Sequence, residues 1–179
     1  EVSQSLNAAY DTGVANVDQA LGRIIEALEK AGKRENTIII VMGDHGEALG
    51  DAGRIGHSNN LNDAVIRVPL VWMDPALNLN GVTRNDDVST IDIMPTLLQR
   101  VGATVPVGLD GRDLSEILNE QSLASRPIRS QSAGLSSMLQ RRAVNERAGL
   151  DEVVSSGNLR VLFTADGRVL AERRESKKV

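Results

Sequence analysis

The stretch TIIIVMGDHGEALGDAGRIGH, residues 37–57, joins a run of β-branched residues to a glycine-rich loop. The apolar run over 37–42 is typical of a strand buried on both faces, as in a sheet covered by helices. The loop after it holds Asp44 and both histidines of the chain, His45 and His57. Sites in open α/β sheets form at the carboxyl ends of strands. We therefore predict a functional site in this loop.

Helices and strands are predicted on both sides of this stretch. Before it, apolar residues recur at helical spacing over 6–31, and Gly32 is expected to end that helix. After it, residues 66–73 predict a second buried strand, with Pro69 at its start or on an edge. This alternation of helix and buried strand indicates an α/β fold.

A second helix is predicted over 89–102, and its start has two interpretations. Ser89 and Asp92 have the spacing of a capping box, or Asp92 is itself the N-cap. Pro95 is well tolerated only in the first turn of a helix, which favours a start near Asp92. Residues 111–118 predict a further short helix.

The C-terminal region gives a strong signal only near its end. Residues 159–172 alternate around Asp166 and Gly167, which predicts a β-hairpin. Residues 119–158 remain poorly assigned, apart from a mostly polar stretch of helical character that runs through 150. The chain opens on residues that already have a helical pattern, so we expect it to be part of a longer protein.

Composition excludes several classes of partner and site. The 179 residues fit one domain, or a large part of one. A net charge of -4 with dispersed basic residues argues against binding to nucleic acid. The absence of cysteine excludes disulfides and thiolate metal ligands. No apolar run approaches the ~20 residues of a membrane span, so we expect membrane association only through a segment outside this sequence.

The residue types of the loop suggest metal and anion chemistry. A turn at Gly46 can bring the side chains of Asp44 and His45 to one centre. A carboxylate with an imidazole suits Zn²⁺ or Mn²⁺ better than Ca²⁺, although further ligands must come from elsewhere. His57 either ligates the metal, or holds an anionic group and assists a leaving oxygen by proton transfer.

A purely structural interpretation fits the same residues. Asp44 and His45 could form only a surface turn, with the aspartate as its cap. His57 would then have a structural role. Glu47 is expected to be a loop or helix-start acid rather than a catalyst, and Asp51 to be solvated.

Four separated motifs carry a family resemblance. In chain order they are YDTGVANVDQALGRIIEALEKAG, NTIIIVMGDHGEALGDAGRIGH, AVIRVPLVWMDP and VSTIDIMPTLLQRVG. Together, over roughly residues 10–118, they resemble the C-terminal half of the sulfatase family in the alkaline phosphatase-like superfamily. The resemblance implies an α/β fold, a mixed sheet sandwiched by helices, with the hairpin at the C-terminal end. Residues 1–179 would then form the C-terminal part of a sulfatase-like catalytic domain.

The resemblance also implies roles for the loop residues. Asp44 and His45 become ligands of one or two divalent ions, namely Zn, Mn or Ca. His57 becomes a catalytic residue placed against the sulfate or phosphate group. The nucleophile is a modified Cys or a Ser in sulfatases, and a Thr or Ser in phosphoryl transferases. It lies upstream in the family, so we expect this chain to be inactive alone.

The implied function is metal-dependent hydrolysis of sulfate esters. Phosphoethanolamine or glycerol-phosphate transfer and phosphoester hydrolysis are alternatives within the superfamily, and a noncatalytic binding module is a third. The substrate would be a small-molecule, lipid or glycan ester. The resemblance favours a periplasmic or membrane-anchored extracytoplasmic location.

Overall fold

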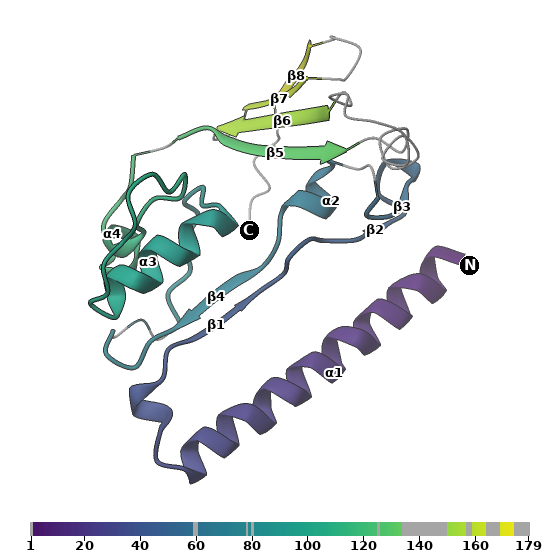
Figure 1. Ribbon diagram of the computed structural model, residues 1–179. Helices are drawn as coiled ribbons and strands as arrows, with labels where there is room; N and C mark the ends of the chain where they lie inside the picture. Colours follow the sequence, from purple (N-terminus) through teal and green to yellow (C-terminus); the bar gives the residue numbers. More distant parts are fainter. Residues whose placement is uncertain are drawn as a thin grey trace, which may run out of the picture. The chain divides into compact units, whose positions relative to one another are not determined.

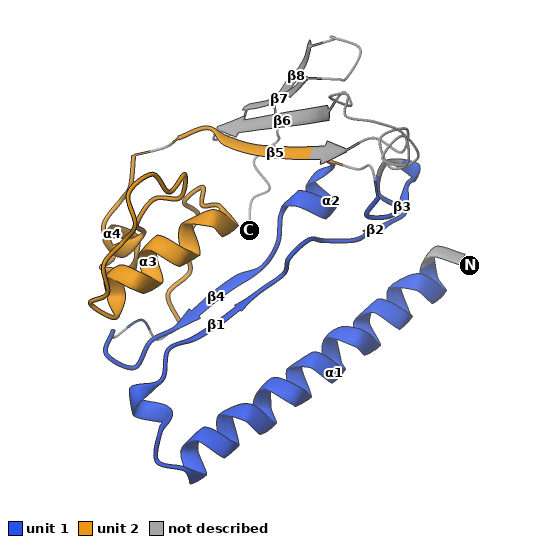
Figure 2. Cartoon of the chain, in the orientation of Figure 1, with its two compact units in different colours: residues 1–58, 62–80 blue, residues 59–61, 81–179 orange. Residues whose placement is uncertain are grey.

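The computed structural model describes residues 2–58, 61–77, 79, 81–124, 126–133, 150–156, 159–163 and 169–173. The chain divides into two compact units (Figure 2), residues 1–58 with 62–80 and residues 59–61 with 81–179. Each unit combines helices with small sheets, and each is described by itself.

The first unit opens with α1 (Val2–Lys30), which confirms the predicted N-terminal helix and begins earlier than expected (Figure 1). Gly32 lies just beyond its end with a left-handed φ of 62°, as predicted for a terminating glycine. The described residues cover its apolar face only partly. Three side chains of that face are more than half exposed: Val14, Val17 and Ile24.

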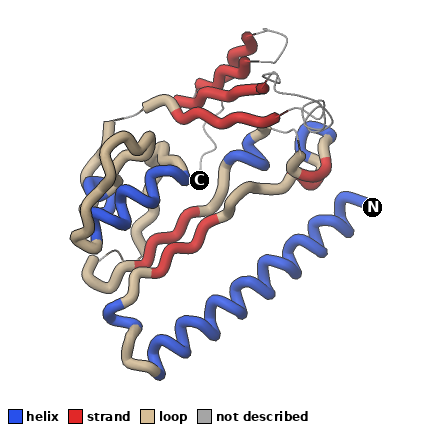
Figure 3. The backbone as a smooth tube through the Cα atoms, viewed as in Figure 1, coloured by secondary structure: helices blue, strands red, loops and turns tan. Residues whose placement is uncertain are grey.

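A short 3-10 turn, η1 (Arg34–Asn36), leads into β1 (Ile39–Met42). β1 pairs antiparallel with β4 (Leu70–Met73), as the adjacent strands of Figure 3 show. We predicted that β1 would be buried on both faces, but its residues are half-buried and Met42 is exposed. Within the described residues β1 is paired with β4 alone, and a two-stranded ribbon leaves much of its surface uncovered.

The predicted strand over 66–73 is wrong in its first half. Ile66 instead ends the short helix α2 (Asp63–Ile66), whose last two amides donate to the Asn62 carbonyl. Pro69 has no amide hydrogen to give to a ladder, so the strand starts only at Leu70. Pro69 was expected at the entry of this strand or on an edge, and it lies directly before the first residue of β4.

Between β1 and α2 the chain forms a tight hairpin. β2 (Ala48–Leu49) pairs antiparallel with β3 (Ile55–Gly56), and η2 (Asp51–Gly53) closes the turn. α1 contacts β2, and Ala48 is fully buried. The hairpin is therefore anchored in the first unit through β2.

The second unit is centred on α3 (Ile93–Arg100), which continues from η3 (Thr90–Asp92). The capping box is present, and the Ser89 amide donates to the Asp92 carboxylate at 2.9 Å. The α-helix itself starts next to Asp92, so Pro95 lies in its first turn as predicted. α4 (Ser115–Leu118) is only the second half of the predicted helix over 111–118.

Four antiparallel strands follow in sheet order β5-β6-β7-β8. They are β5 (Ile128–Ala133), β6 (Leu150–Ser156), β7 (Leu159–Phe163) and β8 (Val169–Arg173). The β7–β8 pair confirms the predicted C-terminal hairpin, whose turn at Asp166 and Gly167 lies outside the described residues. β5 and β6 fall in the poorly assigned region and were not predicted. The expected helical stretch before Leu150 lies outside the described residues.

No helix in the described part of the chain is both long enough and apolar enough to cross a membrane. α1 has 29 residues but carries charged side chains, such as Asp18 and Arg23, along its length.

Candidate functional site

The loop after β1 is held against α2 by its main chain. The Gly46 amide donates to the Val65 carbonyl at 2.7 Å. A Cβ atom built on Gly46 would overlap the Ala64 carbonyl oxygen. Only glycine therefore allows this close approach, which fixes the positions of His45 and Glu47 on either side of it.

The hydrogen bonds of His45 determine which of its ring nitrogens is available. Nδ1 lies 2.9 Å from the Gly46 carbonyl oxygen. A carbonyl can only accept, so Nδ1 carries the hydrogen and Nε2 keeps its lone pair in the neutral ring. Metal-binding histidines commonly use this arrangement, with one nitrogen held by a backbone carbonyl and the other free for the metal.

Asp44 lies beside that free nitrogen. Its Oδ2 atom is 3.9 Å from His45 Nε2, while its Oδ1 accepts the His45 amide at 2.9 Å. The Asp44 side chain is 91% exposed, so it is open to a ligand. The structure thus places one carboxylate oxygen and one imidazole nitrogen next to each other.

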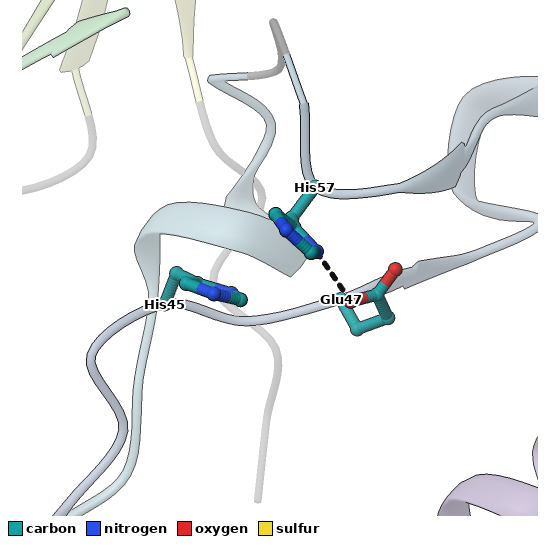
Figure 4. Close-up of side chains that lie close together, drawn as sticks. All are labelled: His45, Glu47 and His57. Carbon is teal, nitrogen blue, oxygen red and sulfur yellow. Dashed lines mark hydrogen bonds and ion pairs between the residues drawn. The ribbon is translucent and has the colours of Figure 1, made fainter.

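The β2–β3 hairpin brings His57 back to the same place. Its register pairs Ala48 with Gly56, and one step further along the same register Glu47 stands opposite His57. Glu47 Oε2 lies 2.8 Å from His57 Nδ1, as the dashed line in Figure 4 shows. The Glu47 side chain is 27% exposed, against 48% for His57.

The two histidine rings stack on each other. Their centroids are 4.1 Å apart and their planes are inclined by 27°. The loop therefore brings together the only two histidines of the chain (Figure 4), as expected from its glycines. Asp44 lies next to His45, with Oδ2 3.9 Å from Nε2.

The donor atoms fit a divalent metal. His45, Glu47 and His57 each offer one ligand atom within 4.8 Å of the others, and Asp44 adds a carboxylate on the open side of His45. Mixed carboxylate and imidazole donors are typical of zinc and manganese sites. Glu47 Oε2 and His57 Nδ1 already bind each other, so the described donor atoms that remain open include Asp44 Oδ2, His45 Nε2 and His57 Nε2.

Sequence reasoning missed the part played by Glu47, which was expected to be a loop acid. Its partner lies ten residues away across a ladder of two-residue strands. The sequence does contain one signal for this hairpin. A short apolar segment lies on each side of the glycine-rich turn, namely Ala48–Leu49 before it and Ile55 with Gly56 after it. Asp51 was expected to be solvated, but its exposed carboxylate also accepts the Leu49 amide at 3.1 Å and so closes the turn.

Comparison with known proteins identifies the family. A family model for sulfatases matches residues 2–103, more than half of the chain. The chain belongs to the sulfatase family. This confirms the resemblance carried by the four motifs, and it places the chain in a family of ester hydrolases.

Curated relatives match a little under two-thirds of this chain. The chain is 36% identical over 121 residues to the multifunctional alkaline phosphatase superfamily protein PehA of Trinickia caryophylli, covering 65% of this chain and 23% of PehA. It is 36% identical over 111 residues to the ulvan-active sulfatase of Formosa agariphila, covering 61% of this chain and 22% of that protein. This chain thus spans about a quarter of the length of these relatives.

Solved structures of the superfamily share the fold over most of the chain. The phosphonate monoester hydrolase of Silicibacter pomeroyi aligns with a TM-score of 0.75 and 25% identity, covering 90% of this chain and 33% of that one. The phosphonate monoester hydrolase of Agrobacterium radiobacter also gives 0.75, with 26% identity and coverage of 89% and 33%. The predicted alkaline phosphatase-like α/β class is thereby confirmed.

Proposed function

We propose that this chain supplies part of the active site of a metal-dependent hydrolase of sulfate esters. The observation that carries the proposal is the convergence of His45 and His57, 4.1 Å apart, beside Asp44 on one exposed loop. Family membership supports the reaction class. A surface turn or a noncatalytic binding module would not need these side chains to meet.

Each loop residue has a proposed role. Asp44 and His45 Nε2 hold a divalent cation, of which zinc or manganese suits these donors better than calcium. The bound cation supplies positive charge that favours the ionised form of an oxygen nucleophile and offsets the charge of the ester oxygens. In its protonated form, with hydrogen on both ring nitrogens, His57 donates a hydrogen bond from Nε2 to the anionic group and can pass that proton to the leaving oxygen.

The nucleophile and the remaining metal ligands come, in this proposal, from a part of the protein outside these residues. Residues 1–179 would be the C-terminal part of the catalytic domain, including the poorly assigned 119–158 and the hairpin over 159–172. The coverage of relatives supports this, because the chain spans 33% of each phosphonate monoester hydrolase. Two donors are also fewer than the three or four protein ligands that zinc usually takes. We therefore expect these 179 residues alone to be inactive.

Phosphate or phosphonate monoester hydrolysis is the second candidate. Both phosphonate monoester hydrolases share the fold over about nine-tenths of this chain, with identities of 25% and 26%. Sulfate and phosphonate monoesters both present an anionic group with an ester oxygen as leaving group, so His57 could serve either substrate. Transfer of phosphoethanolamine or glycerol phosphate is a further alternative, which rests on the resemblance at His57.

The proposed substrate is a small-molecule, lipid or glycan ester, and the proposed location is outside the cytoplasm. Two relatives are named as extracellular sulfatases, in Caenorhabditis elegans and Drosophila melanogaster, and these names support the location. The ulvan-active sulfatase supports a glycan substrate.

Metal removal from the full-length protein tests the reaction. We expect a chelator to abolish cleavage of p-nitrophenyl sulfate, and zinc or manganese to restore it. Parallel assays with p-nitrophenyl phosphate and a phenylphosphonate monoester rank the two candidates by kcat/KM. Full activity after the metal has been removed would contradict the proposal. Absence of cleavage of all three esters would favour the transferase or the binding module.

A further inference from the structure

The backbone of the β2–β3 hairpin places Glu47 and His57 next to each other, so their contact does not depend on two mobile surface side chains. Ala48 pairs with Gly56, and Leu49 with Ile55, so the antiparallel register places Glu47 directly opposite His57. Residues opposite each other on adjacent strands have side chains on the same face of the ladder. The backbone thereby holds carboxylate and imidazole within reach of each other, at 2.8 Å.

The Glu47 end of the pair is the more constrained one. Glu47 follows Gly46, whose main chain lies against α2, and it precedes the fully buried Ala48. Its side chain is 27% exposed, compared with 48% for His57. Glu47 is therefore the fixed partner, and the imidazole is the group that it orients.

The chemistry of the pair sets the state of the ring. A carboxylate only accepts hydrogen bonds, so His57 Nδ1 carries the hydrogen. Nε2 is then the nitrogen left to face another group. A carboxylate that holds a histidine in one tautomer and orientation is a recurrent device in enzymes, from metal sites to hydrolases.

We propose that Glu47 is a positioning residue: it fixes the His57 ring so that, in the imidazolium form, Nε2–H faces the anionic group of the ester. This inference deepens the proposed function and rests on it. Glu47 would touch neither the substrate nor the metal. The competing assignment is that Glu47 and His57 both bind the metal. The ligand atoms of His45, Glu47 and His57 lie close enough together for that.

Kinetics of the full-length protein test the positioning role. Glu47→Ala should lower kcat by about 10- to 100-fold, the usual effect of losing a group that orients a catalytic ligand. KM should change little, because the oriented Nε2 acts mainly in the transition state. Glu47→Gln keeps an acceptor oxygen for Nδ1–H and should recover most of kcat. Glu29→Ala, which removes an exposed glutamate of α1, is the matched control.

A double variant and a spectroscopic readout separate this inference from the proposed function. If Glu47 acts through His57, Glu47→Ala should cost no further activity in the His57→Ala background. Ring ¹⁵N shifts, assigned by the loss of the His57 signals in His57→Ala, should show hydrogen on Nδ1 in the wild type. They should show the other tautomer gaining population in Glu47→Ala.

Three outcomes would overturn the inference. Glu47→Ala could be as active as the Glu29→Ala control, it could lose the metal, or it could leave the ring shifts of His57 unchanged. Loss of metal would make Glu47 a ligand. If His57→Ala alone proves fully active, the proposed catalytic role of His57 fails. The nitrogen shifts still decide whether Glu47 orients the ring.

Discussion

At the scale of single residues, Gly46 occupies a position in the loop where only glycine fits. Its amide bonds to the Val65 carbonyl, and its α-carbon faces the Ala64 carbonyl without room for a side chain. His45 and Glu47 are its neighbours in sequence, so a displacement of Gly46 moves both. The sequence predicted a turn at Gly46, but it did not predict that Gly46 lies against the backbone of α2.

Gly46→Ala should therefore destabilise the protein, by about 1–3 kcal/mol or more, because the added methyl group overlaps backbone that cannot move aside. Gly13→Ala is the matched control. Gly13 lies inside α1, and an added methyl group there would meet nothing within 4 Å, so alanine should stabilise by about 0.5–1 kcal/mol. Denaturant unfolding of both variants measures the difference. Equal midpoints for Gly46→Ala and the wild type would show that the loop can move away from α2.

At the scale of elements, Asp92 connects the start of α3 to distant segments. Its carboxylate is fully buried and accepts hydrogen bonds from the Ser89 and Arg112 amides, each at 2.9 Å. It also pairs with the Arg126 guanidinium. The capping role was predicted from local spacing. The pairing with Arg126, 34 residues along the chain, has no local signal in the sequence.

Asp92→Ala should destabilise the protein by about 3–5 kcal/mol, because it leaves the Arg126 guanidinium largely buried without its counter-charge. Asp113→Ala removes an exposed carboxylate that accepts the Ser115 amide, and should cost only about 1 kcal/mol. Free energies of unfolding for both variants test the contrast. Adding Arg126→Met to Asp92→Ala should recover part of the loss. Equal effects of Asp92→Ala and Asp113→Ala would mean that the buried pair does not stabilise the second unit.

At the scale of the whole molecule, long periodic segments were predictable and short ones were not. α1, β1, α3 and the β7–β8 hairpin each carry a regular apolar pattern or a terminating glycine, and all were expected. The strand over 66–73 was half wrong, because an apolar run does not distinguish strand from a single helical turn.

The candidate site was also predictable only in part. Residue types pointed to Asp44, His45 and His57, since a carboxylate and two histidines on one glycine-rich loop are chemically informative. The Glu47–His57 pair depends on the register of strands only two residues long, which no periodicity reveals. The proposed roles of all four side chains involve a metal and a substrate, which no pattern in these residues reveals.

Metal content and turnover of His45→Ala and His57→Ala, measured side by side in the full-length protein, test the central claim most directly. We expect His45→Ala to lose both metal and activity, because we assign His45 Nε2 as a metal ligand. His57→Ala should keep its metal while kcat falls by about 10²- to 10⁴-fold, the usual contribution of a positioned acid or base. Loss of metal in both variants would make His57 a ligand, and full activity in both would show that the loop is only a turn.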